Sequence, residues 1–237
     1  MHNYHFVKMM RPGLKVSPST NQLTTAVRHK RSVTHPNWLW ENASTVTFSF
    51  KEDVPADLRL RIEYCIRQWE PYISLALELV EDGQGQIRIA VEGEASHSQL
   101  GTNALLLAQE EPTMVLGIKT DSPLFEKIVL HEFGHALGFH HAHLHPDANI
   151  PWDKPTIYAV MAKEGWDKED VDENYFNRLP AHAVYGAYDK HSVMHYGVPG
   201  AWTFNRLNIE ETRTLSEGDK NFARTIYPAL DYRALPT

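Results

Sequence analysis

The sequence has a single cysteine among 237 residues, so no disulfide can form within the chain. The fold must therefore rest on its hydrophobic core, helped by a metal ion if one binds. No run approaches the roughly 18 consecutive apolar residues of a membrane span, so we expect no membrane insertion. Basic residues are fewer than acidic ones, 23 against 30, and the net charge of −7 argues against a nucleic-acid partner, which would need a clustered basic surface.

The N-terminal region lacks the apolar core of about 7–15 residues that a secretory signal peptide requires. Three locations therefore stay open: export by a non-classical route, export after removal of a signal, and the cytoplasm. Residues 1–37 are polar and are interrupted by Pro12, Pro18 and Pro36, which predicts an irregular N-terminal arm. This arm is either a solvated tail or a pro-segment, with residues 28–31 (RHKR) as a candidate processing site.

From residue 38 onwards the sequence has the pattern of one globular domain. Alternating or β-rich segments predict strands at Thr45–Phe50 and at residues 75–80, 86–91 and 113–118. Periodic apolar segments predict helices over residues 55–73, 124–137, 154–163 and 216–227, the last capped by Ser216. The order of these elements is typical of an α+β fold in which helices back a mixed, twisted sheet.

Histidine is abundant, with 14 residues, and it is the commonest side-chain ligand of transition metals. His131 and His135 lie one helical turn apart in the segment HEFGHALGFHH, so both imidazoles project from one helix face and can bind one ion. Glu132 lies beside them, where its carboxylate can reach a water on that ion. Pairs of this kind favour a metal site on the second helix.

The end of the segment supplies a third nitrogen. Gly138 can adopt a positive φ, which ends the helix and turns the chain back towards the two histidines. His141, six residues past His135, is then the third ligand, although a shift of one residue would exchange it for His140. Three imidazoles and one open position are typical of a catalytic Zn²⁺.

The alternative is an amphipathic helix with two incidental histidines. At about 5% per specified residue, the five specified positions match by chance in roughly one chain of this length in ten thousand. The alternative is therefore weak. His143 and His145 are expected at the surface or behind the ligands, and a second metal site there stays open as a further alternative.

These motifs resemble those of a known family. The segment HEFGHALGFHH is similar to the extended zinc motif of the metzincin metallopeptidases, and SVMHYG at residues 192–197 resembles their Met-turn. Phe139 and the Met-His-Tyr order are most similar to the astacin branch, and weaker similarity covers about residues 35–228. The resemblance implies a two-lobed α+β catalytic domain over residues 38–237. Its active-site cleft would separate an upper lobe, about 38–140, from a lower lobe, about 141–237.

The resemblance also implies roles for individual residues. Those assigned to one zinc ion are His131, His135, His141 and, as a fifth ligand, Tyr196. Glu132 would be the general base, Tyr196 would also stabilise the oxyanion, and Met194 would lie beneath the metal. An edge strand at residues 99–107 or 113–118 would pair with the substrate backbone. Trp202 and Phe204 would line a substrate pocket unless they are core residues.

Two features depart from typical astacins. Those proteins carry a glutamate directly after the third histidine, which pairs with the mature N-terminus, and this sequence has Ala142 there. Typical astacins also contain disulfides, which a single cysteine excludes. Cysteine-poor bacterial astacin-like enzymes are therefore the relatives that fit best.

The sequence thus predicts a monomeric zinc endopeptidase that hydrolyses peptide bonds in proteins or peptides with a metal-activated water. Two alternatives stay open. A zinc-stabilised binding protein without catalysis is disfavoured by the retained Glu132, which a structural zinc site does not need. A metal hydrolase of a non-peptide amide would use the same residues, so the sequence does not separate it from a peptidase.

Overall fold

The structure is a computed structural model that describes residues 38–51, 54–81, 83–93, 95–177 and 186–229. The predicted N-terminal arm at residues 1–37, with its candidate processing site, lies outside these residues. None of the helices in the described ranges combines the length and the apolar character that crossing a bilayer requires.

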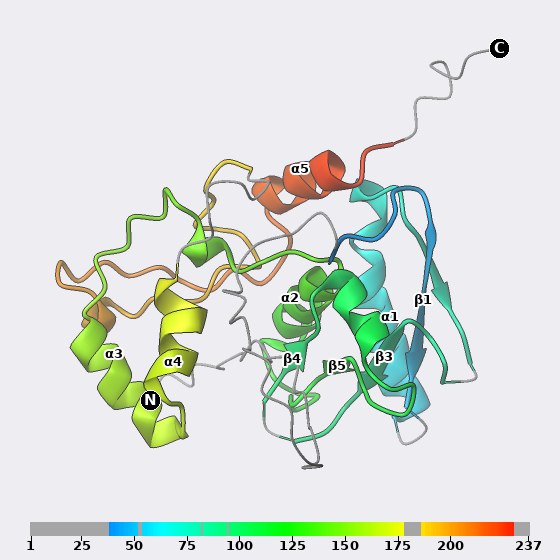
Figure 1. Ribbon diagram of the computed structural model, residues 1–237, viewed down its shortest axis with the longest axis horizontal. Helices are drawn as coiled ribbons and strands as arrows, with labels where there is room; N and C mark the ends of the chain where they lie inside the picture. Colours follow the sequence, from blue (N-terminus) through cyan, green and yellow to red (C-terminus); the bar gives the residue numbers. More distant parts are fainter. Residues whose placement is uncertain (1–37, 52–53, 82, 94, 178–185, 230–237) are drawn as a thin grey trace, which may run out of the picture.

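A five-stranded mixed sheet forms one end of the molecule (Figure 1). Its strands are β1 (Thr45–Phe50), β2 (Ala76–Leu79), β3 (Ile87–Ala90), β4 (His97–Ser98) and β5 (Met114–Val115). They lie in the order β2-β1-β3-β5-β4, and every pairing is parallel except that of β4 with β5. The predicted mixed sheet and α+β class are confirmed, with four of the five strands expected from the sequence.

The edge of the sheet lies elsewhere than predicted. Residues 99–107 form mostly the 3₁₀ helix η3 (Gly101–Leu106), and residues 113–118 contribute β5, which lies between β3 and β4. Both candidates for the edge strand were therefore wrong, because the outermost strand beside β5 is β4. A strand of two residues is too short to show a periodic signal in the sequence.

Helices α1 (Ala56–Arg67) and α2 (Phe125–Ala136) pack against each other beside the sheet. The prediction that the first helix continues to residue 73 was wrong. Pro71 has no N–H to donate and cannot continue an α-helix, so the chain forms the 3₁₀ turn η2 (Glu70–Tyr72) instead. The main core lies between these helices and the sheet, and its largest apolar side chains include Trp69, Phe48, Phe133 and Phe139.

The other end of the molecule, on the left in Figure 1, contains α3 (Lys154–Met161) and α4 (Lys168–Val171). The helix expected near residues 154–163 is confirmed, whereas α4 was not predicted. A capping box between Asp167 and Asp170 begins it, and a π-helical turn, η6 (Asp172–Phe176), follows. These elements enclose a second core, which consists of Ile157, Met161, Val171, Tyr175, Tyr196 and Trp202.

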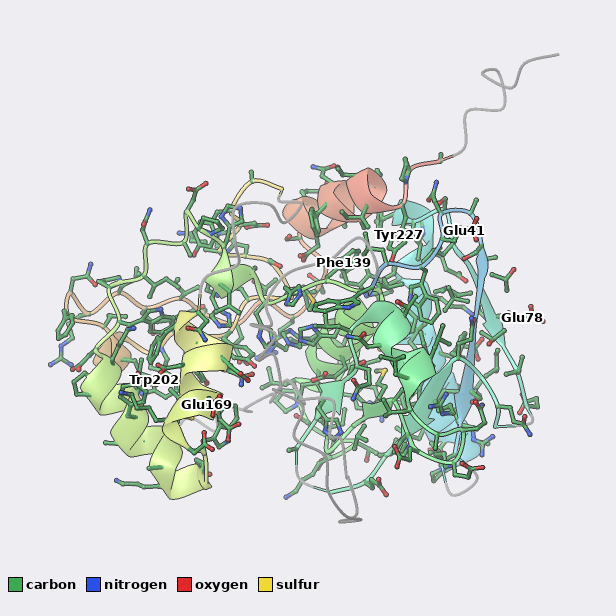
Figure 2. All side chains as sticks on the ribbon, in the orientation of Figure 1. Glu41, Glu78, Phe139, Glu169, Trp202 and Tyr227 are labelled. Carbon is green, nitrogen blue, oxygen red and sulfur yellow. The ribbon has the colours of Figure 1, made fainter. Side chains whose placement is uncertain are left out.

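Helix α5 (Glu217–Ile226) begins at Ser216 as predicted, with a capping box to Asp219. It packs on the main core, since the Tyr227 hydroxyl donates to the carbonyl of Leu137 (2.6 Å) and Tyr227 lies beside Phe139 in Figure 2. Although α5 falls in the predicted lower lobe, its contacts are therefore with the sheet end. The lobe boundary at residues 140 and 141 stays a prediction. The remaining short helices are η4 (Ala142–Leu144), η5 (Ala162–Glu164) and η7 (Gly200–Trp202).

Arg88 on β3 is a buried cation whose hydrogen bonds go to backbone carbonyls. The side chain is 1% exposed, and it donates to the carbonyls of Glu111 (2.7 Å), Ala108 (3.1 Å) and Gly85 (3.3 Å). One guanidinium thereby ties the chain that follows η3 to the centre of the sheet. Burial lowers its pKa from the ordinary value, although the guanidinium stays charged.

We therefore expect Arg88→Met to lower the free energy of unfolding by about 3 kcal/mol, because the substitution leaves the buried carbonyl of Gly85 and the partly buried carbonyls of Ala108 and Glu111 without this donor. Urea unfolding followed by circular dichroism measures this loss. The matched control is Arg213→Met at an exposed arginine, which should change stability by less than about 0.5 kcal/mol. Equal stability of the two variants would show that the hydrogen bonds of Arg88 to backbone carbonyls do not stabilise the fold.

Candidate metal centre

The two histidines of α2 project into the interior. His131 is fully buried and His135 is 1% exposed, and their ring centroids lie 4.7 Å apart. The helix ends as predicted, because Gly138 takes a φ of +94° and the N–H of Phe139 bonds back to the carbonyl of Gly134 (2.9 Å). The chain then reverses direction towards the helix.

This reversal brings His141 to the same point. Its ring centroid lies 5.1 Å from that of His131 and 4.6 Å from that of His135. One nitrogen from each of the three rings lies within 4.8 Å of the others, close enough to hold a single ion. His140 points elsewhere, with its ring 6.2 Å from that of Trp38, so the structure selects His141 over His140 for this cluster.

Backbone carbonyls fix which ring nitrogens face the centre. Nδ1 of His131 lies 2.8 Å from the carbonyl of Val193, and Nδ1 of His135 lies 2.7 Å from that of Phe139. Because a carbonyl only accepts, both Nδ1 atoms carry the proton and each Nε2 keeps its lone pair.

The remaining nitrogens fit a divalent cation. Nε2 of His131 is buried without a hydrogen-bond partner among the described residues, and Nε2 of His135 faces Nε2 of His141 at 3.0 Å. Two imidazole lone pairs at that distance need a cation or a proton between them. Burial also lowers the pKa of His135 to about 3, and it lowers the pKa values of His131 and His141 well below normal, so all three rings are neutral at neutral pH. Neutral imidazoles are the form that binds zinc.

Glu132 is fully buried, and neither carboxylate oxygen has a hydrogen-bond partner within the described ranges. Burial raises the pKa of this carboxyl well above its ordinary value, and the ammonium of Lys127 partly opposes that shift. A buried acid without partners is costly to the fold, which is typical of a group kept for chemistry.

Met194 lies directly against the helix that carries the histidines. A Cβ placed on Gly134 would come within 2.4 Å of the Met194 sulfur, so α2 needs a glycine there although glycine costs a helix about 1 kcal/mol relative to alanine. The Met194 carbonyl also accepts from the N–H of Ala142 (3.0 Å), next to the third histidine. Met194 thus contacts both segments that bring the imidazoles together.

Tyr196 lies beside the cluster with 5% of its surface exposed. Its ring centroid is 4.2 Å from that of His141 and 5.9 Å from that of His131. Burial raises the pKa of its phenol well above the ordinary value, so the hydroxyl stays protonated at neutral pH. The sequence-predicted neighbours of the metal are therefore brought together by the fold.

The two residues assigned to a substrate pocket differ from each other. Trp202, labelled in Figure 2, is 7% exposed and packs in the second core. Its ring lies 6.0 Å from that of Tyr175. Phe204 is 74% exposed. The core alternative is correct for Trp202 and wrong for Phe204, and their role as pocket walls stays a prediction.

The other histidines that the structure describes do not form a second metal cluster. Of the two positions expected for these residues, His143 takes the one behind the ligands, because it is 3% exposed and stacks on His141, and His145 is only partly exposed. Within the described part of the chain, the group with metal-binding geometry consists of His131, His135 and His141. The alternative of a second site at His143 and His145 is therefore not supported.

Sequence reasoning missed an ion pair that a buried lysine of the histidine helix makes with a partly buried glutamate. Lys127, one helical turn before His131, is 1% exposed, and its Nζ lies 3.4 Å from a carboxylate oxygen of Glu211. Glu211 in turn packs on Gly197, where an added Cβ would come within 2.7 Å of its side chain. The signal available in the sequence was a lysine four residues before His131, on the histidine face of the helix.

Comparisons with known proteins identify relatives. The family model for the astacin family of peptidases matches residues 32–227. Zinc metalloproteinase nas-38 of Caenorhabditis elegans is 27% identical in an alignment of 192 residues that covers 76% of this chain and 23% of that protein. The chain thus spans about a quarter of the length of this relative.

Solved structures of myroilysin and of a zinc-protease are also similar to this chain. A structure of myroilysin is 38% identical, covers 84% of this chain and 98% of its own, and superposes with a TM-score of 0.78. High choriolytic enzyme 1, a hatching enzyme zinc-protease from the medaka fish Oryzias latipes, is 17% identical, covers 81% of this chain and 94% of its own, and has a TM-score of 0.54. At that identity it bears on the fold alone.

The buried imidazoles predict a loss of stability in acid. Burial lowers the pKa of His135 and His143 to about 3 and that of His195 to about 4, from 6.5. Below pH 6.5 the unfolded chain therefore binds protons that the folded chain does not. Above pH 6.5 the free energy of unfolding does not depend on the protonation of these rings. As the pH falls towards 4, the free energy of unfolding decreases by up to about 1.4 kcal/mol per pH unit for each ring.

Urea unfolding of the zinc-free protein across this pH range measures the slope. His195→Gln should reduce the slope, whereas His191→Gln, at an exposed histidine, should leave it unchanged. A free energy of unfolding that is flat between pH 6.5 and pH 4 would show that these rings are protonated in the folded protein.

Proposed function

Because the chain belongs to the astacin family of peptidases, we propose that it is a zinc-dependent endopeptidase that hydrolyses peptide bonds in proteins or peptides. The observation that carries this proposal is the combination of three converging imidazoles with a buried, unpartnered carboxylate beside them. A structural zinc site is closed by four protein ligands and has no use for such an acid.

Nε2 of His131, His135 and His141 would hold the zinc ion. When bound, zinc supplies a Lewis acid that polarises the scissile carbonyl and acidifies a water molecule. The carbonyls of Val193 and Phe139 keep the first two rings oriented for this task, so little reorganisation is needed when the ion enters.

Glu132 would act as the general base and then as the general acid. Its carboxylate takes a proton from the attacking water and delivers it to the leaving amine. Burial raises the pKa of this carboxyl, which strengthens it as a base towards the water. The ammonium of Lys127 opposes this rise in pKa.

Tyr196 would stabilise the oxyanion that forms at the scissile carbonyl. Its phenol stays protonated and can donate a hydrogen bond to that developing charge. The ring lies against His141, so the hydroxyl belongs to the same small region as the ligand nitrogens.

The deciding experiment compares hydrolysis of an unfolded protein mixture by the wild type, by chelated enzyme before and after zinc is restored, and by Glu132→Ala. We expect chelation to abolish cleavage, zinc to restore it, and Glu132→Ala to bind one zinc per chain while losing about a thousandfold in rate. Mass spectrometry of the fragments and zinc analysis give both readouts. The control is Glu78→Ala, an exposed glutamate on β2 (Figure 2), which should keep full activity.

Each alternative function has its own outcome. Stoichiometric zinc without cleavage of any protein would favour the zinc-stabilised binding protein. Cleavage of non-peptide amides alone would favour the other hydrolase. Wild-type turnover by Glu132→Ala would remove the proposed general base.

Tyr196→Phe removes the hydroxyl and keeps the ring. We expect this variant to retain zinc and its melting temperature, and to lose about tenfold to a hundredfold in kcat with little change in KM, because the oxyanion contact forms only in the transition state. Steady-state kinetics on one cleaved peptide measures this. The control Tyr64→Phe, at a tyrosine 70% exposed on α1, should behave as the wild type. Full activity of Tyr196→Phe would refute the role.

A further inference from the structure

Tyr196 is packed against a histidine outside the metal cluster. The ring of His143 stacks on that of Tyr196 with centroids 4.5 Å apart and an interplanar angle of 24°. The same ring stacks on His141 at 5.2 Å and 26°. Three rings therefore contact one another: the third imidazole of the cluster, the phenol beside it, and His143.

His143 is itself held firmly. Its Nε2 lies 2.6 Å from the carbonyl of Asn174, to which it must donate, and Asn174 is 1% exposed in the π-helical turn η6. The Asn174 side chain in turn donates to the carbonyl of Asp170 (2.8 Å) in α4. A chain of hydrogen bonds thus connects the α4 end of the molecule to the ring that covers Tyr196.

We propose that His143 is a positioning residue that restrains the ring of Tyr196 so that its hydroxyl stays at the catalytic centre. The proposal rests on the proposed function. His143 is not part of the cluster that could hold the metal, and its donor nitrogen is occupied by Asn174, so it reaches the site through the two rings on which it stacks, and that of Tyr196 is nearer than that of His141. A phenol on a rotatable side chain gains from such a restraint, because a misplaced donor stabilises the transition state poorly.

Two substitutions of His143 test the role of its ring separately from the role of its hydrogen bond to Asn174. His143→Phe keeps a stacking ring and loses the hydrogen bond to Asn174, and a neighbouring cavity of about 330 Å³ gives the larger ring room. His143→Gln keeps a donor near the Nε2 position and loses the ring.

If the ring restrains Tyr196, we expect His143→Phe to melt at a lower temperature yet keep kcat within about threefold. His143→Gln should keep its stability and lose about tenfold in kcat at unchanged KM. The reverse order of kcat would overturn the proposal.

A double-mutant cycle shows whether His143 acts through Tyr196. In the Tyr196→Phe background there is no hydroxyl to position, so adding His143→Gln should lower kcat by less than about twofold, against about tenfold in the wild type. Equal losses in both backgrounds would mean that His143 supports the site in some other way, and would overturn the proposal.

A readout that needs no catalysis separates this proposal from the proposed function. In protein labelled with 3-fluorotyrosine, the Tyr196 signal is identified by its absence from Tyr196→Phe. We expect one ring orientation in the wild type and in His143→Phe, and exchange between orientations in His143→Gln, with and without zinc. An inactive wild type with this pattern would refute the peptidase and keep the restraint. An unchanged signal in His143→Gln would refute the restraint even if the enzyme cleaves proteins.

Discussion

Two peptide carbonyls determine how two of the three imidazoles of the site are oriented. Those of Val193 and Phe139 each accept the Nδ1 proton of one histidine, so each Nε2 is aimed inward before an ion arrives. Val193 is held in turn by Asp219 of α5, whose carboxylate accepts from its N–H (2.8 Å). Two hydrogen bonds therefore connect the N-terminal turn of α5 to the ring of His131 on α2.

The parts that were predicted correctly depend on local rules. The spacing of His131 and His135 and the glycine at 138 specify a helix with two histidines on one face and a turn at its end, whatever surrounds them. The helix over residues 216–227 also carries its own start signal in Ser216. Each of these features is decided within one or two turns of chain, so the sequence alone contains the information.

The parts that were missed depend on distant neighbours. Strand β4 exists only because β5 offers it a partner, and Pro71 ends α1 where the apolar spacing alone would continue it. Lys127 is separated from Glu211 by 84 residues and His143 from Asn174 by 31, so no local pattern pairs them. Such contacts appear only once the chain is folded, which is why the predicted site lacked its supporting residues.

Residues of the site that are close in the sequence belong to two different hydrophobic cores. Met194, beneath the histidine helix, belongs to the main core, whereas Tyr196, two residues later, belongs to the smaller core of α3 and α4. Elements with less buried apolar surface open first when a protein fluctuates. Opening of the smaller core would carry Tyr196 away and leave His131 and His135 in the main core, so the proposed catalytic geometry depends on the smaller core even where the rest of the fold persists.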